Sequence, residues 1–178
     1  MSNQEKRIEI LTKAQLRNVL KRLTIEILEK VDDPQNIILM GIPTRGVNLS
    51  EVIALEIYKT IGYDVEKGII DPTFHRDDQS KVATKSINVD SIPESIDAKD
   101  IILIDDVIYT GRTVRAAIEA LNFWGRPKKI MLLTMIDRGH RELPIQPDFC
   151  GKKVFTNREQ NIELRLQSLD KIEGVFLV

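Results

Sequence analysis

Three short runs made almost wholly of apolar residues constrain the fold of this chain most strongly. They span residues 37–42, 101–104 and 129–136, and none shows the polar alternation of a strand with one wet face. Such runs are typical of strands buried on both faces of a parallel sheet. Segments with a helical spacing of apolar residues, at 47–61 and 113–124, lie between them. Strands that alternate with helices predict an α/β fold with a central, mostly parallel sheet flanked by helices.

Local signals predict the remaining elements. Thr12 and Gln15 form a capping-box pattern, which begins a first helix that continues to Val31. The polar segment 75–85 is expected to be a loop. Further strands are predicted at 68–74, 85–89, 153–156, 162–166 and 174–178. With 178 residues, the chain (residues 1–178) is expected to form a single domain.

Composition excludes several classes of protein. Cys150 is the single cysteine, and His75 and His140 are the only histidines. An intrachain disulfide and a zinc site of the Cys₄, Cys₂His₂ or three-histidine type are therefore impossible. No apolar run reaches the roughly 18 residues that span a bilayer, and the N-terminus lacks the apolar region of a signal peptide. We expect a cytoplasmic protein without a membrane partner.

Charge is distributed unevenly along the chain. The 26 basic and 27 acidic side chains argue against binding of nucleic acid through bulk positive charge. Residues 1–30 nevertheless carry a net charge of +3, residues 31–125 of −7 and residues 126–165 of +4. The two basic segments are either scattered solvated surface or parts of one basic surface. The sequence leaves both interpretations open.

The loops that follow the three apolar runs are the candidate site. In parallel sheets, ligands bind beyond the carboxyl ends of the strands. These loops comprise residues 43–46, 105–113 and 137–141, and each is rich in residues that can bind anions or hydroxyls. We therefore expect a ligand to lie where the three loops meet.

The segment 101–113 carries the most specific signal. Asp105 and Asp106 end an apolar strand, and the turn 110–113 opens a helix. Backbone amides at a helix N-terminus bind phosphate, and Gly111 permits a close approach of the backbone. Paired carboxylates accept hydrogen bonds from vicinal hydroxyls or lie near a Mg²⁺ ion on a diphosphate. A phosphate site beside a diol site suits a phosphorylated ribose.

Two other kinds of nucleotide site lack their required residues. A P-loop needs a lysine directly after its second glycine, but the nearest match, at 41–46, continues with Val47 and Asn48. No G-x-G-x-x-G pattern opens a helix, so a dinucleotide-binding fold is unsupported. A purely structural strand end is disfavoured, because adjacent buried carboxylates cost desolvation free energy.

The stretch 101–113 resembles the phosphoribosyl diphosphate (PRPP) signature of type I phosphoribosyltransferases. With residues 41–46, 76–78 and 137–144, it makes nearly the whole chain similar to the bacterial bifunctional regulators of pyrimidine-operon attenuation. The resemblance implies a type I phosphoribosyltransferase fold with a flexible hood loop at about 75–85 and short C-terminal strands. It also implies uracil phosphoribosyltransferase activity, which converts uracil and PRPP into UMP and diphosphate.

The resemblance also implies roles for individual residues. Asp105 and Asp106 would hold the ribose hydroxyls and Arg45 would stabilise the departing diphosphate, which makes these three the candidate catalytic residues. Mg²⁺ is expected as a cofactor carried by PRPP near the two aspartates, without direct protein ligands. Uracil would be faced by Arg138, Ile162 and the backbone near Ile136. In such enzymes the loop at 44–46 often contains a non-proline cis peptide. The residues expected to bind PRPP or nucleotide are Thr44, Arg45, Gly46, Arg76, Asp105, Asp106, Val107, Ile108, Tyr109, Thr110, Gly111, Arg112 and Thr113.

A regulatory role follows from the same resemblance. The family binds the leader mRNA of its own operon, more tightly in the presence of uridine nucleotides such as UMP and UTP. Lys and Arg at the RNA-facing positions would neutralise phosphates. Members assemble as homodimers or higher oligomers, so self-association is expected. The residues that match RNA-facing positions are Arg17, Arg22, His140, Arg141 and Lys152.

Some residues depart from the family pattern. Ile25 stands where relatives can place His, His75 replaces a usual Tyr, and Pro43 alters the surroundings of the diphosphate loop. Two other functions stay open. One is a type I phosphoribosyltransferase for another base without RNA regulation, although residues 137–141 lack the aromatic, lysine-bearing loop expected of purine enzymes. The other is a non-catalytic nucleotide sensor that binds RNA.

Overall fold

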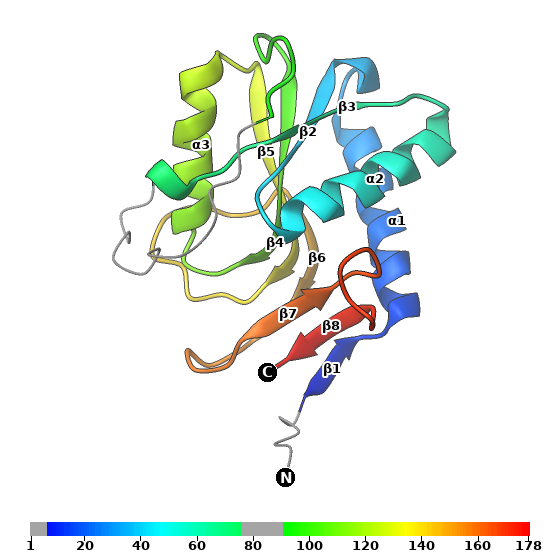
Figure 1. Cartoon of the computed structure of the whole chain (residues 1–178), viewed down its shortest axis with the longest axis vertical. Coiled ribbons are helices and arrows are strands. Elements are labelled where there is room, and N and C mark those ends of the chain that lie inside the picture. The colour runs from blue at the N-terminus through cyan, green and yellow to red at the C-terminus, as the bar shows by residue number, and fades with distance from the viewer. Residues whose placement is uncertain (1–6, 76–90) are drawn as a thin grey trace.

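The centre of the molecule is a five-stranded parallel sheet. The computed structural model describes residues 7–75 and 91–178, and the sheet has the strand order β3-β2-β4-β5-β6 (Figure 1). The three apolar runs form its three inner strands, as predicted. The strands are β2 (Ile37–Gly41), β3 (Glu66–Ile69), β4 (Asp100–Ile108), β5 (Lys129–Asp137) and β6 (Phe149–Lys153).

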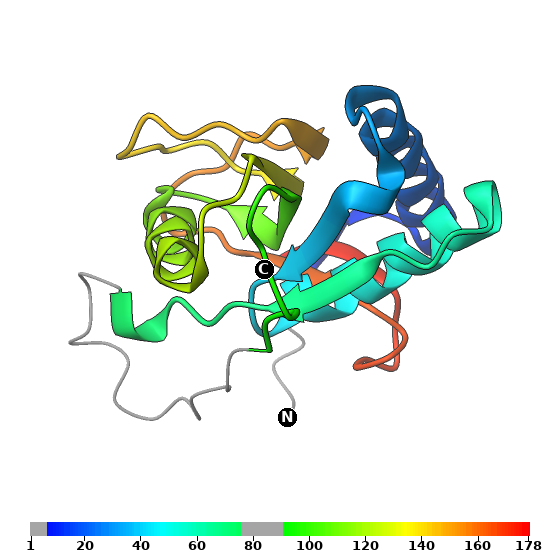
Figure 2. The same ribbon diagram turned by 90° about the horizontal axis from the view of Figure 1, so that it is seen from above.

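Helices cover both faces of this sheet. Within the described residues, α1 (Lys13–Lys30) and α2 (Arg45–Ile61) pack on one face and α3 (Arg112–Trp124) packs on the other, as the view from above shows (Figure 2). Along β4, alternate residues face the two layers: Ile102 and Ile104 face α1 and α2, and Leu103 faces α3. Because both faces are covered, β4 has to be apolar at every position along this stretch.

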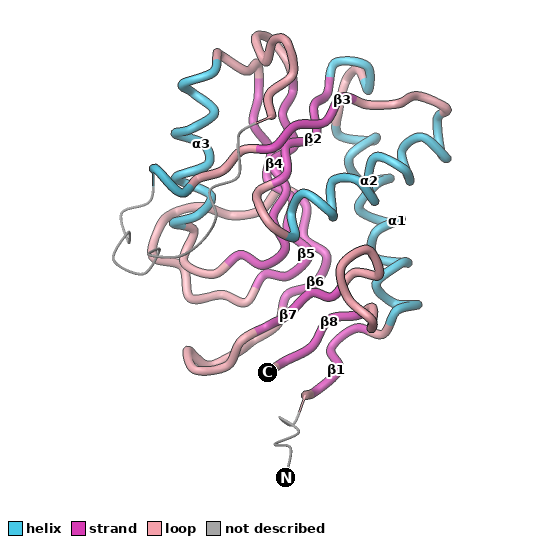
Figure 3. Tube along the Cα trace, in the orientation of Figure 1, coloured by secondary structure: helices cyan, strands magenta, loops and turns pink. Residues whose placement is uncertain are grey.

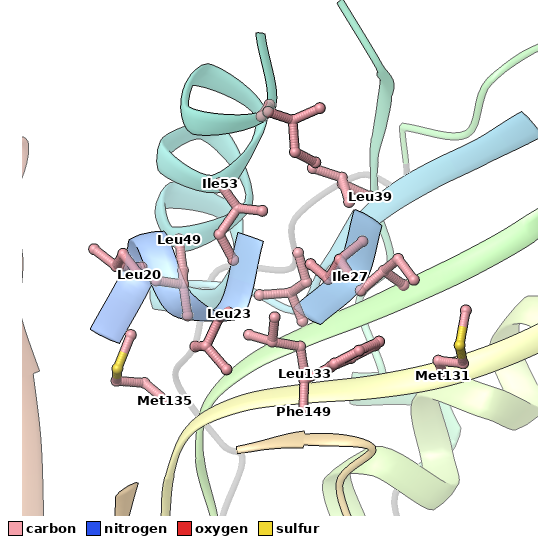
Figure 4. Close-up of a cluster of buried hydrophobic side chains, with 14 of the residues drawn as sticks. Leu20, Leu23, Ile27, Leu39, Leu49, Ile53, Met131, Leu133, Met135 and Phe149 are labelled. Carbon is pink, nitrogen blue, oxygen red and sulfur yellow. The ribbon is translucent and has the colours of Figure 1, made fainter. Parts of the chain in front are cut away.

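The larger core lies between the sheet and the helices α1 and α2 (Figure 4). Burial of one such aliphatic side chain contributes about 1.5–3 kcal/mol. The capping box predicted at Thr12 is present, since its hydroxyl accepts the Gln15 N–H and the Gln15 side chain accepts the Thr12 N–H. This cap fixes the start of α1 and directs its apolar stripe into the core. Labelled members of the core are Leu20, Leu23, Ile27, Leu39, Leu49, Ile53, Met131, Leu133, Met135 and Phe149.

A second, antiparallel sheet lies beyond the carboxyl ends of β4, β5 and β6 (Figures 1 and 3). It contains β1 (Ile8–Leu11), β8 (Gly174–Leu177) and β7 (Ile162–Arg165) in that order. Leu11, Leu164 and Val175 extend from it into the larger core. The small sheet therefore stands next to the edge at which the candidate loops emerge.

The structure corrects two of the predicted strands. The strand predicted at 68–74 is β3, which ends at Ile69, and Thr73–His75 instead form a 3₁₀ helix (η2) directly after Pro72, which has no N–H for a strand ladder. The strand predicted at 153–156 lies earlier, as β6, because its pairing with β5 begins at Phe149. A second 3₁₀ helix, η1 (Pro34–Asn36), precedes β2.

Several expectations lie partly or wholly outside the described residues. The predicted strand at 85–89 and the hood loop, apart from His75, belong to this group. The β1 strand was not predicted. None of the helices in the described part of the chain is long and apolar enough to cross a membrane.

Candidate functional site

The chain directly after β2 packs against the last part of β4, at the edge of the main sheet from which the candidate loops emerge. The Ile42 N–H donates to the Ile104 carbonyl at 2.9 Å. A Cβ atom added at Gly46 would overlap that same carbonyl oxygen and would lie 3.3 Å from the Cα atom of Asp105. Glycine at position 46 is therefore what allows the first loop to approach the acidic pair. The Pro43–Thr44 peptide bond is cis, as expected from the resemblance.

The acidic pair lies inside the last part of β4 and not after it, since the strand continues to Ile108. Asp105 is buried, with 8% of its surface exposed. One of its carboxylate oxygens accepts the Asp106 N–H at 2.9 Å, and a carboxylate oxygen of Asp106 accepts the Val107 N–H at 2.8 Å. These local hydrogen bonds hold both carboxylates at the edge of the site.

A hollow of about 370 Å³ follows the acidic pair. It is lined by Asp105, residues 107–114 and Glu142. Gly111 caps α3 with a φ of 92°, a conformation that favours glycine, and no acidic side chain occupies the first turn of this helix. The positive end of the helix therefore faces a hollow without a neighbouring carboxylate in that turn, which suits an anionic group.

The segment 139–145, which follows β5, builds one wall of this hollow. The N–H groups of Glu142 and Leu143 donate to the Thr110 carbonyl at 3.0 and 3.2 Å. Arg112 Nε donates to a Glu142 carboxylate oxygen at 2.8 Å. The hollow thus depends on the relative position of two loops, one after β4 and one after β5.

Arg45, the first residue of α2, is paired with Asp170, which lies between β7 and β8. The Nη1–Oδ2 and Nη2–Oδ1 distances are 2.6 and 3.3 Å. The hydrogen bond to Asp170 raises the pKa of Arg45, and the nearby charge of Asp106 raises it further. The same hydrogen bond lowers the pKa of Asp170 below its ordinary value. The structure therefore brings Arg45 close to Asp106, as the predicted site requires, and adds Asp170.

Arg138 is a buried cation with neutral partners. Only 6% of its surface is exposed. Its guanidinium donates to the side chains of Thr156 and Asn161 at 3.3 and 3.4 Å and to the Asn157 carbonyl at 3.1 Å. Its Cζ atom lies 4.2 Å from the centre of the Tyr109 ring. Because burial of a charge without a carboxylate partner is costly, this guanidinium is well suited to hydrogen-bond a polar ligand.

The other residues predicted to face uracil lie near Arg138. Ile162 begins β7 directly after Asn161 and is partly buried. Ile136 has a fully buried side chain and is flanked by Val107 and Lys152 in the neighbouring strands. Only backbone groups near Ile136 are therefore candidates for a base contact. Arg76, predicted to bind PRPP, lies outside the described residues.

The predicted RNA-facing residues on α1 lie on different sides of the helix. Arg17 lines a groove of about 750 Å³ between α1 and α2, together with Lys13, Lys21 and Lys59. Five residues further along, Arg22 is rotated by roughly 140° around the helix axis. It donates to the carbonyls of Cys150 and Gly151 at 3.2 and 2.6 Å. The neighbouring Lys152 has its Nζ atom 3.4 Å from the Ile10 carbonyl.

The predicted RNA-facing residues after β5 are largely occupied by internal contacts. His140 has a φ of 59°, and its Nε2 atom lies 2.6 Å from the Thr156 carbonyl. Arg141 has a side chain that is only 13% exposed, and its guanidinium bonds to groups of its own and the preceding loop. Arg17, Arg22, Arg141 and Lys152 therefore do not form one continuous basic face, so of the two interpretations that the charge pattern left open the structure favours separate basic surfaces.

The acidic residues offer a limited set of metal ligands. Across residues 7–75 and 91–178, no group of three or more His, Cys, Asp or Glu side chains could hold a metal ion. Asp105 and Asp106 supply two adjacent carboxylates, hard oxygen donors of the kind that Mg²⁺ prefers when a phosphate ligand carries it. The donor set thus fits an ion that enters with its substrate.

Comparison with known proteins identifies the family. The sequence profile described as phosphoribosyl transferase domain matches residues 8–169. A Bifunctional protein PyrR from Microcystis aeruginosa is 47% identical over 171 residues, which cover 96% of this chain and 97% of that protein. This chain belongs to the PyrR family of phosphoribosyltransferases. A second PyrR protein, from Latilactobacillus sakei, is 42% identical and covers 95% of this chain and 96% of its own length.

Solved structures confirm the fold of this PyrR-family chain. A hypoxanthine phosphoribosyltransferase from Trypanosoma cruzi has a TM-score of 0.74 at 12% identity, covering 96% of this chain and 94% of its own. A hypoxanthine phosphoribosyltransferase from Staphylococcus aureus has a TM-score of 0.67 at 18% identity, covering 87% and 80%. At these identities the comparison shows the type I phosphoribosyltransferase fold alone.

Sequence reasoning missed several polar residues at the candidate site. Asp170 pairs with Arg45, and Thr156 and Asn161 hold Arg138. All three lie C-terminal to the motifs: Thr156 and Asn161 follow Arg138 by 18 and 23 residues, and Asp170 follows Arg45 by 125 residues. No local pattern marks them, because their partners become neighbours only when the small antiparallel sheet packs on the main one.

Proposed function

We propose that this chain converts uracil and PRPP into UMP and diphosphate, and that it regulates transcription attenuation of the pyrimidine operon by uridine-nucleotide-dependent binding of leader mRNA. The relatives that share 42–47% of its residues over nearly its full length are named bifunctional PyrR proteins. One structural observation carries the catalytic part. A carboxylate pair, an anion-binding hollow and a buried guanidinium lie at the same edge of the sheet.

The reaction assigns a task to each of these groups. Uracil N1 forms a bond to the anomeric carbon of PRPP while the bond from that carbon to the diphosphate oxygen breaks, and the N1 proton leaves to solvent. Asp105 and Asp106 would accept hydrogen bonds from the ribose hydroxyls. The 5-phosphate would occupy the hollow at the start of α3. This arrangement would fix the anomeric carbon between the base and the leaving group.

Arg45 and Arg138 would act at opposite ends of the substrate pair. Negative charge develops on the departing diphosphate, which Arg45 would stabilise electrostatically. Mg²⁺ carried by PRPP would supply further neutralisation of that charge. Arg138 would hydrogen-bond a carbonyl oxygen of uracil, for which its polar, uncharged partners leave it well placed.

The RNA-binding part of the proposal involves the exposed cations on and beside α1. The Arg17 side chain is 56% exposed and that of Arg22 46% exposed, and Lys152 is also exposed. Exposed Lys and Arg bind nucleic acid phosphates with a strong dependence on salt. His140 would provide a polar contact to an RNA loop. Arg141 is not one of these exposed cations, because its side chain is mostly buried.

We also propose that the protein self-associates, as a homodimer or a larger homo-oligomer, in the cytoplasm. Leu55, Tyr58 and Ile61 on the outer side of α2 are 53%, 53% and 43% exposed. An interface that covered these side chains would remove apolar surface from water. Sedimentation equilibrium at micromolar concentration tests this directly, because a monomer would contradict it.

Two assays test the function. Incubation with Mg²⁺, PRPP and uracil is expected to yield UMP, and absence of UMP would contradict the catalytic proposal. A gel shift with the pyrimidine-operon leader RNA, with and without UMP, tests the regulatory proposal. RNA binding is expected to tighten with UMP and to weaken steeply with added salt. RNA binding that is absent, or indifferent to UMP, would contradict regulation while leaving the enzyme intact.

A further inference from the structure

The Arg141 side chain is mostly buried and makes contacts with several groups of the protein itself. Its side chain is 13% exposed and that of its ion-pair partner Asp137 is 8% exposed. The Nη2–Oδ1 distance between them is 2.8 Å, a contact between opposite charges that lacks hydrogen-bond geometry. A cation that neutralises RNA phosphates has to reach solvent, whereas this one is enclosed and already paired. The position of Arg141 therefore calls for a different role.

Three backbone carbonyls complete the surroundings of this guanidinium. Arg141 Nε donates to the Ile145 carbonyl at 2.9 Å. Its Nη1 atom donates to the Tyr109 carbonyl at 2.8 Å and lies 3.3 Å from the Gly139 carbonyl. Tyr109 belongs to the loop after β4, whereas Gly139 and Ile145 belong to the segment after β5. One side chain thus ties together the two loops between which the hollow lies.

The shape of the hollow depends on the distance between the loops after β4 and β5. Tyr109 lines it, and the Ile145 side chain lies 3.5 Å from where a Cβ atom of Gly111 would be. A shift of either loop would change the distance between the turn 110–113 and the wall that carries Glu142. Since phosphate is held by several short hydrogen bonds at once, a small change in that distance weakens all of them.

Asp137, which pairs with Arg141, is itself held in place. The Asp137 carboxylate that pairs with Arg141 accepts the Gly139 N–H at 2.9 Å, and Asp137 is the last residue of β5, paired with Lys153 of β6. The chain of contacts therefore runs from the rigid sheet through Asp137 and Arg141 to the Tyr109 carbonyl. Arginine suits this position because its planar fork presents donors in several directions, whereas the single ammonium of lysine cannot reach three carbonyls and a carboxylate in the same way.

We propose that Arg141 is a positioning residue of the nucleotide site, which holds the loops after β4 and β5 at the separation that a 5-phosphate requires. This inference rests on the proposed function, which places the 5-phosphate in the hollow. It also assigns any loss of RNA binding in Arg141 variants to weakened nucleotide binding and not to a lost RNA contact.

Arg141→Lys distinguishes a positioning role from an RNA contact, because lysine keeps the positive charge but lacks the planar guanidinium. Calorimetry without RNA is expected to show UMP binding weakened about tenfold, as befits the loss of a preorganised contact network. Uridine, which has no phosphate, is expected to compete for the site within twofold of its wild-type affinity. Equal UMP affinity in wild type and variant, or an equal loss for uridine and UMP, would overturn the proposal.

The matched control is Arg165→Lys. The Arg165 side chain is 19% exposed and pairs with Glu163 at 2.7 Å, so burial and chemistry are similar, but its contacts with Glu163 and the Phe176 ring lie outside the hollow. UMP binding by this variant is expected to stay within twofold of wild type. A tenfold loss there as well would show that any Arg→Lys change weakens UMP binding, and the proposal would fail.

Asp137→Asn provides a second test, which stands even if Arg141→Lys does not fold. This substitution weakens the ion pair that holds Arg141, so the affinity for UMP is expected to fall severalfold in the absence of RNA. If Arg141 were instead an RNA contact, release from its carboxylate would strengthen RNA binding at fixed nucleotide saturation, and that result would overturn the proposal. Failure of the wild-type protein to bind UMP at all would contradict the proposed function. Binding that is unaffected in both variants would contradict only the role of Arg141.

Discussion

Arg45 and Asp170 form a two-pronged ion pair although 125 residues separate them in the chain. Asp170 is itself fixed, since its Oδ2 atom accepts the Leu166 N–H at 3.0 Å and its own N–H donates to the Leu166 carbonyl at 2.8 Å. The pair joins the first residue of α2 to the turn between β7 and β8. The small antiparallel sheet thus orients a residue that we assign to the diphosphate.

Asp170→Asn is expected to lower the free energy of unfolding by about 1 kcal/mol at pH 7, because a charge-assisted, two-pronged hydrogen bond is lost from a position that is only partly buried. The pKa of Asp170 is lowered in the folded state. Its contribution is therefore complete above the unfolded-state pKa of about 3.9 and is lost as the pH falls through the lower folded-state pKa. Urea unfolding at pH 7 and at pH 3 measures both effects.

The difference in unfolding free energy between wild type and Asp170→Asn should therefore be smaller at pH 3 than at pH 7. Asp148→Asn is a useful control, because Asp148 also accepts one ammonium and one backbone N–H, from Lys30 and Leu132, and its pKa is lowered as well. The Asp148→Asn variant is also expected to have a lower free energy of unfolding, but an unchanged KM for PRPP. A stability difference for Asp170→Asn that grows on acidification would contradict the assignment.

Replacing both acidic residues, Asp105→Asn with Asp106→Asn, is expected to abolish UMP formation while the fold is kept. Asparagine has nearly the same volume and can still accept the local N–H bonds, so the strand should be preserved. The ribose hydroxyls would lose charged acceptors, which are roughly twice as strong as neutral ones. Turnover assays and circular dichroism measure the two parts, and retained turnover would show that the ribose assignment is wrong.

Gly46→Ala is expected to be strongly destabilising, by about 2 kcal/mol or more. The new Cβ atom would overlap the Ile104 backbone carbonyl, and neither group can rotate away. Gly62→Ala is the matched control, because position 62 has a φ of 72° but nothing within 4 Å of the added atom. It should cost about 1 kcal/mol, because alanine is strained at a positive φ. Thermal unfolding compares them, and equal losses would contradict the close approach at Gly46.

Arg138→Gln is expected to raise the KM for uracil by about tenfold or more, since it removes the cation at the proposed base site. The KM for PRPP should change by less than about threefold, because the change leaves Asp105, Asp106 and the turn 110–113 intact and removes only a contact with the Tyr109 ring from the lining of the hollow. Steady-state kinetics with each substrate varied in turn measures the two KM values separately. Equal increases in both KM values would indicate a general disturbance of the site and not a base contact.

Elements with strong local signals could be predicted from the sequence. The capping box at Thr12 sets the start of α1, and the inner strands β2, β4 and β5 are apolar because helices cover both faces. The acidic pair and the glycine turn at 111 were placed because the carboxyl end of a buried strand is a known position for ligands.

Features that depend on distant partners could not be predicted. The β1 strand forms through pairing with β8 at the other end of the chain, and Asp170 reaches Arg45 through the small sheet. Arg141 shows the same limit, because its sequence position suggests an exposed cation whereas its fork bonds to the Tyr109 carbonyl. Charge patterns indicate which residues are basic, but burial and partners decide what they do.

The choice of base tests the central claim most directly. The solved structures from Staphylococcus aureus and Trypanosoma cruzi are hypoxanthine enzymes of the same fold, whereas the relatives with the higher sequence identity are PyrR proteins. With Mg²⁺ and PRPP, and each of uracil, hypoxanthine and guanine supplied separately, the account predicts UMP from uracil at a kcat/KM at least about a hundredfold above that for either purine. Formation of a purine nucleotide at a rate equal to or above that of UMP would contradict it.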